Sequence, residues 1–318
     1  MRSEHRRFRP MGAMDILDEV IDIYKSNFAL LLGVAAILYV PISVINGLTA
    51  DYSGRPGHVD WATLLMIPFE AIVTGALAYG ISERYLNKQV SITDCYRRIL
   101  ARPVLLSLIC AVLIKTLIVF GPLLALMLVF HPNIPRDPSL MTPEQAVRLL
   151  AFCALAFIGF IWTFVFGVKM LLVEPALVIE RKGALASIAR SWKATGGIFW
   201  KSVGIYALVV LVFVIVYGII VGPVQFPITQ NILAGLPVSA ASIWLMTILS
   251  TIISTLSIPV FAAARILLYY DVRIRKEAFD LEILAAELDR KAKETPVGDI
   301  TALPQEKSIG SPLDGEPQ

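Results

Sequence analysis

Long apolar stretches separated by short polar segments are the feature that most constrains how this chain can fold. Six such stretches lie at residues 28–50, 61–82, 103–130, 148–173, 198–221 and 242–269. Each is long enough to cross a hydrocarbon core of roughly 30 Å as a helix. Hydrophobic residues make up 57% of the chain and charged residues 17%, against about 25% charged residues in an ordinary soluble domain. The sequence therefore predicts an all-α, polytopic membrane protein with six transmembrane helices.

The distribution of basic residues predicts how the helices are oriented in the membrane. Five Lys or Arg residues lie in each of the segments 1–27, 83–102 and 174–201, and seven follow residue 269. The segments between them are nearly free of basic residues: 51–60 holds only Arg55, 131–147 only Arg136, and 222–241 none. By the positive-inside rule both termini are cytoplasmic and the protein is a multi-pass protein of the inner (plasma) membrane.

The same alternation divides the chain into three regions. Residues 1–10 form a basic cytoplasmic tail, and residues 11–290 form the membrane domain, whose sixth helix continues into the cytoplasm. Residues 291–318 contain several Pro and Gly without periodicity, which predicts a disordered cytoplasmic tail. No cofactor or metal is expected, because the three Cys and three His show no metal-ligand spacing. A nucleic-acid partner is not expected either, since the net charge is only +3 and no basic tract is interleaved with aromatic residues.

Three amphipathic segments, 11–27, 92–102 and 185–193, each lead directly into an odd-numbered apolar stretch. They are expected to be interfacial helices that form a cytoplasmic collar. Their regular placement favours three copies of an interfacial helix followed by a transmembrane hairpin, although any polytopic protein can place a polar helix on the membrane before re-entering it. The first segment is acidic and the other two are basic, which predicts lateral pairing between them and destabilisation by charge reversal at Asp18 and Asp22.

The polar faces of the collar and of the sixth helix form a candidate interaction surface for membrane lipids and for other membrane or cytoplasmic proteins. Its candidate residues are Asp18, Asp22, Arg97, Arg98, Arg190, Trp192, Lys193, Arg273 and Arg275.

Two charged residues, Glu70 and Lys115, lie well inside the second and third apolar stretches. Charges at such depth usually face a bundle interior or water. Since the two stretches run antiparallel, the pair could meet, either as a structural lock or as part of a polar cavity that receives a headgroup or an ion. Lys169, Glu174 and Arg265 lie closer to the predicted cytoplasmic ends, where snorkelling toward the headgroups is expected.

Four stretches together resemble a bacterial family of integral membrane proteins. They are Ile16-Leu17-Asp18-Glu19 with Tyr24 and Phe28, then residues 92–98, Ala189-Arg190-Ser191-Trp192-Lys193, and 267–282, which reads LLYYDVRIRKEAFDLE. Members are often labelled glycerophosphoryl diester phosphodiesterase membrane domain proteins, and the resemblance covers residues 16–284. The usual Gly is replaced here by Ala278. The resemblance implies a multi-helix inner-membrane protein and no established activity, and the chain has no room for the catalytic barrel of about 250 residues.

The leading hypothesis for function is a non-enzymatic scaffold or regulatory module that works through the collar and contacts lipids. The alternative is a transporter or lipid-handling protein with a polar cavity around Glu70 and Lys115. A lipid hydrolase ranks last, because the sequence contains no intramembrane Gly-x-Ser-x-Gly motif and no His-Glu-x-x-His pair.

The topology can be tested by labelling single cysteines in a variant that lacks the native ones. A membrane-impermeant maleimide should label Ser53→Cys in intact spheroplasts, and should label Lys182→Cys only after the membrane is permeabilised. Labelling of Lys182→Cys in intact spheroplasts would contradict the predicted orientation.

Overall fold

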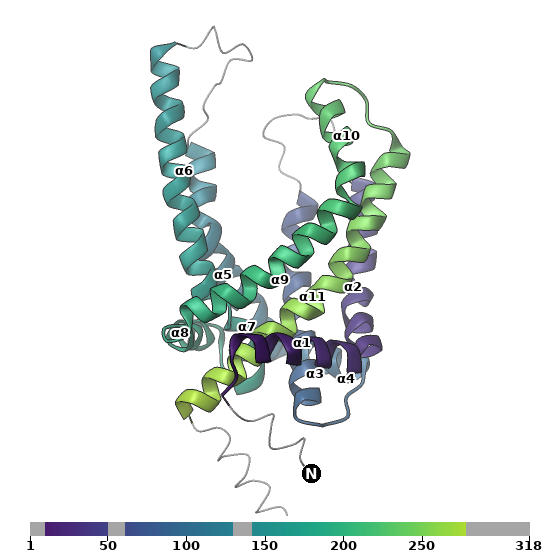
Figure 1. Cartoon of the computed structure of the whole chain (residues 1–318), viewed down its shortest axis with the longest axis vertical. Coiled ribbons are helices and arrows are strands. Elements are labelled where there is room, and N and C mark those ends of the chain that lie inside the picture. Colours follow the sequence, from purple (N-terminus) through teal and green to yellow (C-terminus); the bar gives the residue numbers. More distant parts are fainter. Residues whose placement is uncertain (1–9, 50–60, 130–141, 278–318) are drawn as a thin grey trace, which may run out of the picture. The chain divides into compact units, whose positions relative to one another are not determined.

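The computed structural model describes residues 10–49, 61–129 and 142–277 (Figure 1). Regular structure within these ranges is helical, with no strand. The six apolar stretches correspond to six long helices: α2 (Phe28–Thr49), α3 (Trp61–Tyr85), α5 (Arg102–Val129), α6 (Pro143–Lys169), α9 (Phe199–Ile220) and α11 (Ala240–Glu277). The predicted all-α class is therefore confirmed. The predicted tail 291–318, residues 1–9 of the predicted tail 1–10, and the expected helix beyond Glu277 lie outside the described residues.

Five helices in the described part of the chain are long and apolar enough to cross a membrane: α2, α5, α6, α9 and α11. The helix α3, which carries Glu70, is not among these five, so a sixth crossing stays a prediction. Large apolar side chains point outward from these helices; on α6 they include Leu150, Phe157 and Phe160. A soluble protein rarely exposes so much contiguous apolar surface. The apolar helices are therefore those of a multi-pass membrane protein.

Short helices connect the long ones. The three predicted amphipathic segments are helical, as α1 (Ala13–Ser26), α4 (Ile92–Ile99) and α8 (Ala184–Thr195). Two further short helices, α7 (Val173–Glu180) and α10 (Gly222–Leu233), lie where the sequence indicated a span end and a loop. Within the compact unit Pro10–Arg273, α1, α4, α7 and α8 gather at one end of the long helices (Figure 1).

The inward face of α1 differs slightly from the prediction. Helical periodicity in the sequence predicts an apolar face made of Ala13, Ile16, Leu17, Val20, Ile21 and Tyr24. In the structure Ile16, Val20 and Ile23 are buried, whereas Ala13 and Ile21 are exposed. The helix is amphipathic as predicted, with Ile23 added to its buried face.

The start of α4 shows how the sequence fixes a collar helix. The Ser91 hydroxyl accepts a hydrogen bond from the Asp94 backbone N–H at 3.2 Å, and the Asp94 carboxylate accepts one from the Ser91 N–H at 3.0 Å. This reciprocal cap satisfies backbone donors at the helix N-terminus. Hydrogen bonds from the Ser91 side chain and then its backbone also hold the pKa of Asp94 below its ordinary value.

Completely buried residues come from α3 (Leu77 and Ile81), from the N-cap of α7 (Leu172) and from the second half of α11 (Ile266). Helices α3 and α11 are also joined by a hydrogen bond of 2.7 Å between the hydroxyls of Ser82 and Tyr270. Helix α3 contacts α2, α4, α5 and α7. Small residues allow this close approach: a Cβ atom on Gly80 would lie 2.9 Å from the Cys95 Sγ of α4. Small residues at contact positions are typical of membrane helix packing.

A buried carboxylate near the end of α11 anchors α1 and α9. Asp271 is completely buried, and its Oδ1 accepts a hydrogen bond from the Met11 backbone N–H at 2.8 Å. The Nζ of Lys201 on α9 donates to Asp271 Oδ2 and to the Met11 carbonyl, both at 2.6 Å. Met11, which directly precedes the N-cap residue Gly12 of α1, is thus tied to α9 and α11.

The lateral pairing predicted between the acidic and basic collar helices does not involve Asp18 or Asp22 in the part of the chain that the structure describes. Within the described residues, Asp18 and Asp22 are exposed and neither carboxylate makes an ion pair. Contacts that hold α1 include its buried face, the contact of Met11 with Asp271, and the Tyr24 hydroxyl, which donates to the Leu256 carbonyl at 3.2 Å. The threefold repeat also stays a prediction, since its three collar helices differ in length and in their contacts.

Removing the Asp271 charge should destabilise the protein. We expect Asp271→Asn to lower the free energy of unfolding by about 3 kcal/mol, because Lys201 loses its carboxylate while remaining largely buried. Asp18→Asn is the matched control, an exposed carboxylate that should change stability by less than about 0.5 kcal/mol. Denaturant unfolding in detergent measures both variants, and equal losses would contradict the anchoring role of Asp271.

Candidate functional site

The buried carboxylate of Glu174, on the short helix α7, is surrounded by polar side chains from three of the long helices. Its side chain is only 3% exposed. Lys115 of α5 forms an ion pair with Glu174 Oε1, and Arg265 of α11 places its Nη1 3.8 Å from the same oxygen. The Nε of Arg265 also donates a hydrogen bond to the Tyr206 hydroxyl of α9 at 2.5 Å. We call Lys115, Glu174, Tyr206 and Arg265 the Glu174 cluster; its members come from four different helices.

The position of Glu174 depends on a break between α6 and α7. Helix α6 ends at Lys169, and α7 begins at Val173 after a turn. The Ser191 hydroxyl of α8 donates to the Lys169 carbonyl at 2.8 Å and accepts from the Leu172 N–H at 3.1 Å. Ser191 thereby satisfies backbone groups that the break would leave without partners in a buried place. The break redirects Glu174 into the protein.

The electrostatics of the cluster favour an ionised Glu174. Burying a charge is costly unless it is paired, and two cations surround this carboxylate. Its Oε1 receives both of them, whereas Oε2 is buried and has no hydrogen-bond partner in the described part of the chain. The carboxylate is therefore held by ion pairing on one side only.

The predicted meeting of Glu70 and Lys115 is replaced by this arrangement. Lys115 pairs with Glu174, and Glu70 lies on α3 with an exposed side chain that makes no ion pair within the described residues. Snorkelling was wrong for Glu174 and Arg265, which turn inward. The sequence did carry a signal: Arg265 lies inside the sixth apolar stretch and Glu174 directly follows the fourth, so a charge of each sign was left unpaired by the prediction.

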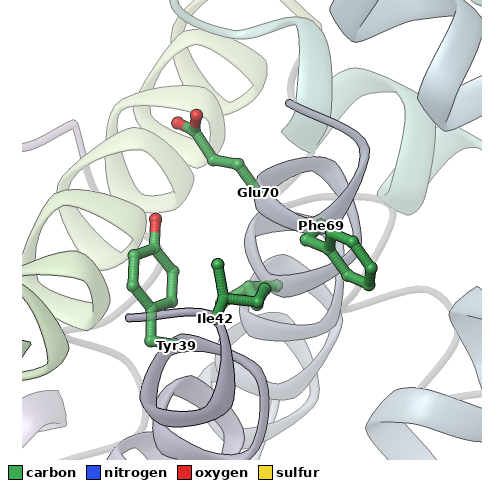
Figure 2. Close-up of a pocket in the computed structure, with 5 residues that line it drawn as sticks. Tyr39, Ile42, Phe69 and Glu70 are labelled. Atoms are coloured by element: carbon green, nitrogen blue, oxygen red, sulfur yellow. The ribbon is translucent and has the colours of Figure 1, made fainter. Parts of the chain in front are cut away.

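Glu70 lines a small pocket with Tyr39, Ile42, Phe69 and Val73, which we call the Tyr39–Glu70 pocket (Figure 2). Its volume is about 180 Å³. Figure 2 shows the Tyr39 hydroxyl and the Glu70 carboxylate directed toward the same space, while the ring of Phe69 points away from them. Arg265 acts electrostatically on both Tyr39 and Glu70, so the pocket adjoins the Glu174 cluster.

Lys169 is the third residue for which snorkelling was expected. Its Nζ lies 5.2 Å from the centre of the Trp192 ring and 5.9 Å from that of Phe199. These distances are in the range of cation–π interactions. The ammonium group therefore rests on aromatic rings at the α6, α8 and α9 junction.

The candidate interaction surface divides into exposed and internally engaged residues. The exposed ones are Asp18, Asp22, Arg97, Trp192, Lys193 and Arg275, whereas Arg98, Arg190 and Arg273 are half-buried. Arg190 donates from Nε to Glu180 Oε1 at 2.8 Å and lies 5.9 Å from the Tyr269 ring centre. Tyr269 donates its hydroxyl hydrogen to the same carboxylate. Arg190 consequently joins α8 to α7 and α11, which its sequence position alone did not reveal.

Burial raises the pKa of the Cys95 thiol to about 11, so it stays protonated at neutral pH and is a poor nucleophile. In the described ranges, no group of three or more His, Cys, Asp or Glu residues is placed to hold a metal ion.

Comparison of the chain with protein-family models, with curated proteins and with solved structures gives no match. The functional argument therefore depends on the geometry alone.

A double-mutant cycle can identify the partner of Lys115. We expect Lys115→Met and Glu174→Gln to show a coupling free energy of about 1 kcal/mol or more, because each removes the other's charge partner. Lys115→Met and Glu70→Gln should be additive within about 0.5 kcal/mol. Thermal or denaturant unfolding in one detergent supplies all the values, and strong coupling to Glu70 with none to Glu174 would refute the cluster.

Proposed function

We propose that this protein is a non-enzymatic membrane module that binds a protein partner through the exposed faces of its collar helices α1, α4 and α8. The observation that carries the proposal is the Glu174 cluster. In this cluster Lys115 and Arg265 both face the buried Glu174 carboxylate, and Arg265 also donates a hydrogen bond to Tyr206. Charges used in this way hold helices together and are not available to line a transport path.

The collar helices are held from inside by polar contacts and expose charged residues on their outer faces. Their inner residues are fixed by polar contacts: Met11 by Asp271, Ser191 by the broken end of α6, and Arg190 by Glu180. Their outer residues include the carboxylates of Asp18 and Asp22 and the guanidinium of Arg97. A surface that presents both signs of charge on rigid helices suits a protein partner better than a uniformly anionic lipid surface.

The location of this module belongs to the proposal as well. The distribution of Lys and Arg supports six crossings of a bacterial inner membrane with both termini and the collar in the cytoplasm. The resemblance to glycerophosphoryl diester phosphodiesterase membrane domain proteins supports the same placement, with an accessory role in place of catalysis.

A second function, lipid handling or transport, is favoured by the Tyr39–Glu70 pocket. An ionisable residue at this depth with no ion-pair partner in the described part of the chain is a functional-site candidate. The two proposals concern different residues of the protein and can be tested separately.

Site-specific photo-crosslinking in cells tests the partner-binding proposal. A photoreactive residue at Asp18, Asp22 or Arg97 should give the same discrete protein adduct, because these side chains point outward from the collar. The control position is Phe157, an exposed apolar residue of α6, where lipid adducts are expected. Lipid adducts alone at all four positions would exclude a stable protein partner at the collar.

A further inference from the structure

The Tyr39–Glu70 pocket contains the elements of an ammonium-binding site. Its acidic member, Glu70, is exposed and carries no ion pair within the described residues, although it lies inside a long, largely apolar helix. Its second polar member is the hydroxyl of Tyr39 on α2, which points toward the same space (Figure 2). Two acceptor groups from two helices thus face one small volume, and no hydrogen bond between them is present in the described structure.

The remaining walls suit a short aliphatic stem. Ile42 and Val73 contribute apolar surface beside the two polar groups. The volume of about 180 Å³ far exceeds the roughly 10–15 Å³ that one water needs by a comparable measure. A primary ammonium group with two or three attached carbons fits this space, whereas a complete lipid would have to leave its chains outside.

The neighbouring charges decide the sign of the ligand. Arg265 acts electrostatically on both Tyr39 and Glu70 and would attract an anion, but its guanidinium is directed to Glu174 and to the Tyr206 hydroxyl. It does not belong to the pocket lining. Lys115 is likewise paired with Glu174. The charge that the pocket itself presents is therefore the negative one of Glu70.

We propose that the Tyr39–Glu70 pocket binds a primary ammonium group, with the Glu70 carboxylate as its counter-ion and the Tyr39 hydroxyl as a further hydrogen-bond acceptor. The ammonium group can come from an ethanolamine lipid headgroup or from a free alkylamine. This inference deepens the second, lipid-handling function and is independent of partner binding at the collar.

The test uses the full-length protein and native mass spectrometry with added lipid. Wild-type protein should retain phosphatidylethanolamine at least tenfold better than phosphatidylglycerol, which lacks the ammonium group. Phosphatidylcholine has a cation but no ammonium N–H donor and should bind with intermediate strength. Glu70→Gln should lose the preference, and Tyr39→Phe should reduce it severalfold.

The matched control is Glu83→Gln, another carboxylate of α3, which pairs with Lys88 outside the pocket and should keep the preference. Because Glu70 is exposed, Glu70→Gln should fold normally, as circular dichroism can verify. Added ethanolamine distinguishes the two sources: displacement of the lipid shows that the free amine suffices, and retention shows that the lipid form is recognised. Equal retention of the three lipids by wild type, or an unchanged preference in Glu70→Gln, would overturn the proposal.

An unchanged preference in Glu70→Gln would leave room for lipid handling elsewhere in the protein, whereas retention of no lipid by wild type would count against the lipid-handling function itself. The two failures are therefore distinguishable.

Discussion

A carboxylate removed from water has to be paired with a cation, and this constraint determines how the helices of the protein meet. Two carboxylates are buried among the described residues, Glu174 and Asp271. Glu174 draws Lys115 and Arg265 to one point, and Asp271 does the same for Lys201. In an environment where apolar surface alone gives little direction to helix association, such contacts specify which helices are neighbours.

Polar contacts also explain residues in two of the four stretches singled out in the sequence, 189–193 and 267–282. Ser191 of the Arg-Ser-Trp stretch supports the break between α6 and α7, and Arg190 pairs with Glu180. Asp271 of the Tyr-Asp-Val-Arg stretch holds the start of α1. Each of these residues acts at the collar end of the protein, so the motifs build the support for the exposed helix faces. The surface proposed for partner binding is consequently the outer side of a rigid assembly.

The helices could be predicted from the sequence because each apolar stretch and each amphipathic segment is a local pattern. The partner of Lys115 could not. A stretch read as one span to Val173 contains a break after Lys169, and that break turns Glu174 inward. Pairing also depends on how each helix is rotated about its axis. When apolar side chains surround a helix almost uniformly, the sequence does not indicate this rotation. Glu70 was recognised as a candidate, but its neighbour Tyr39 could not be, because a tyrosine in an apolar stretch has no distinguishing pattern.

The most direct test of this account is an experimental structure of the protein in lipid nanodiscs at a resolution that shows side chains. The account predicts that Lys115 and Arg265 both contact the Glu174 carboxylate, with α7 separated from α6 by a turn. A continuous helix through residue 174, with the Glu174 side chain at the headgroups and Lys115 beside Glu70, would contradict it.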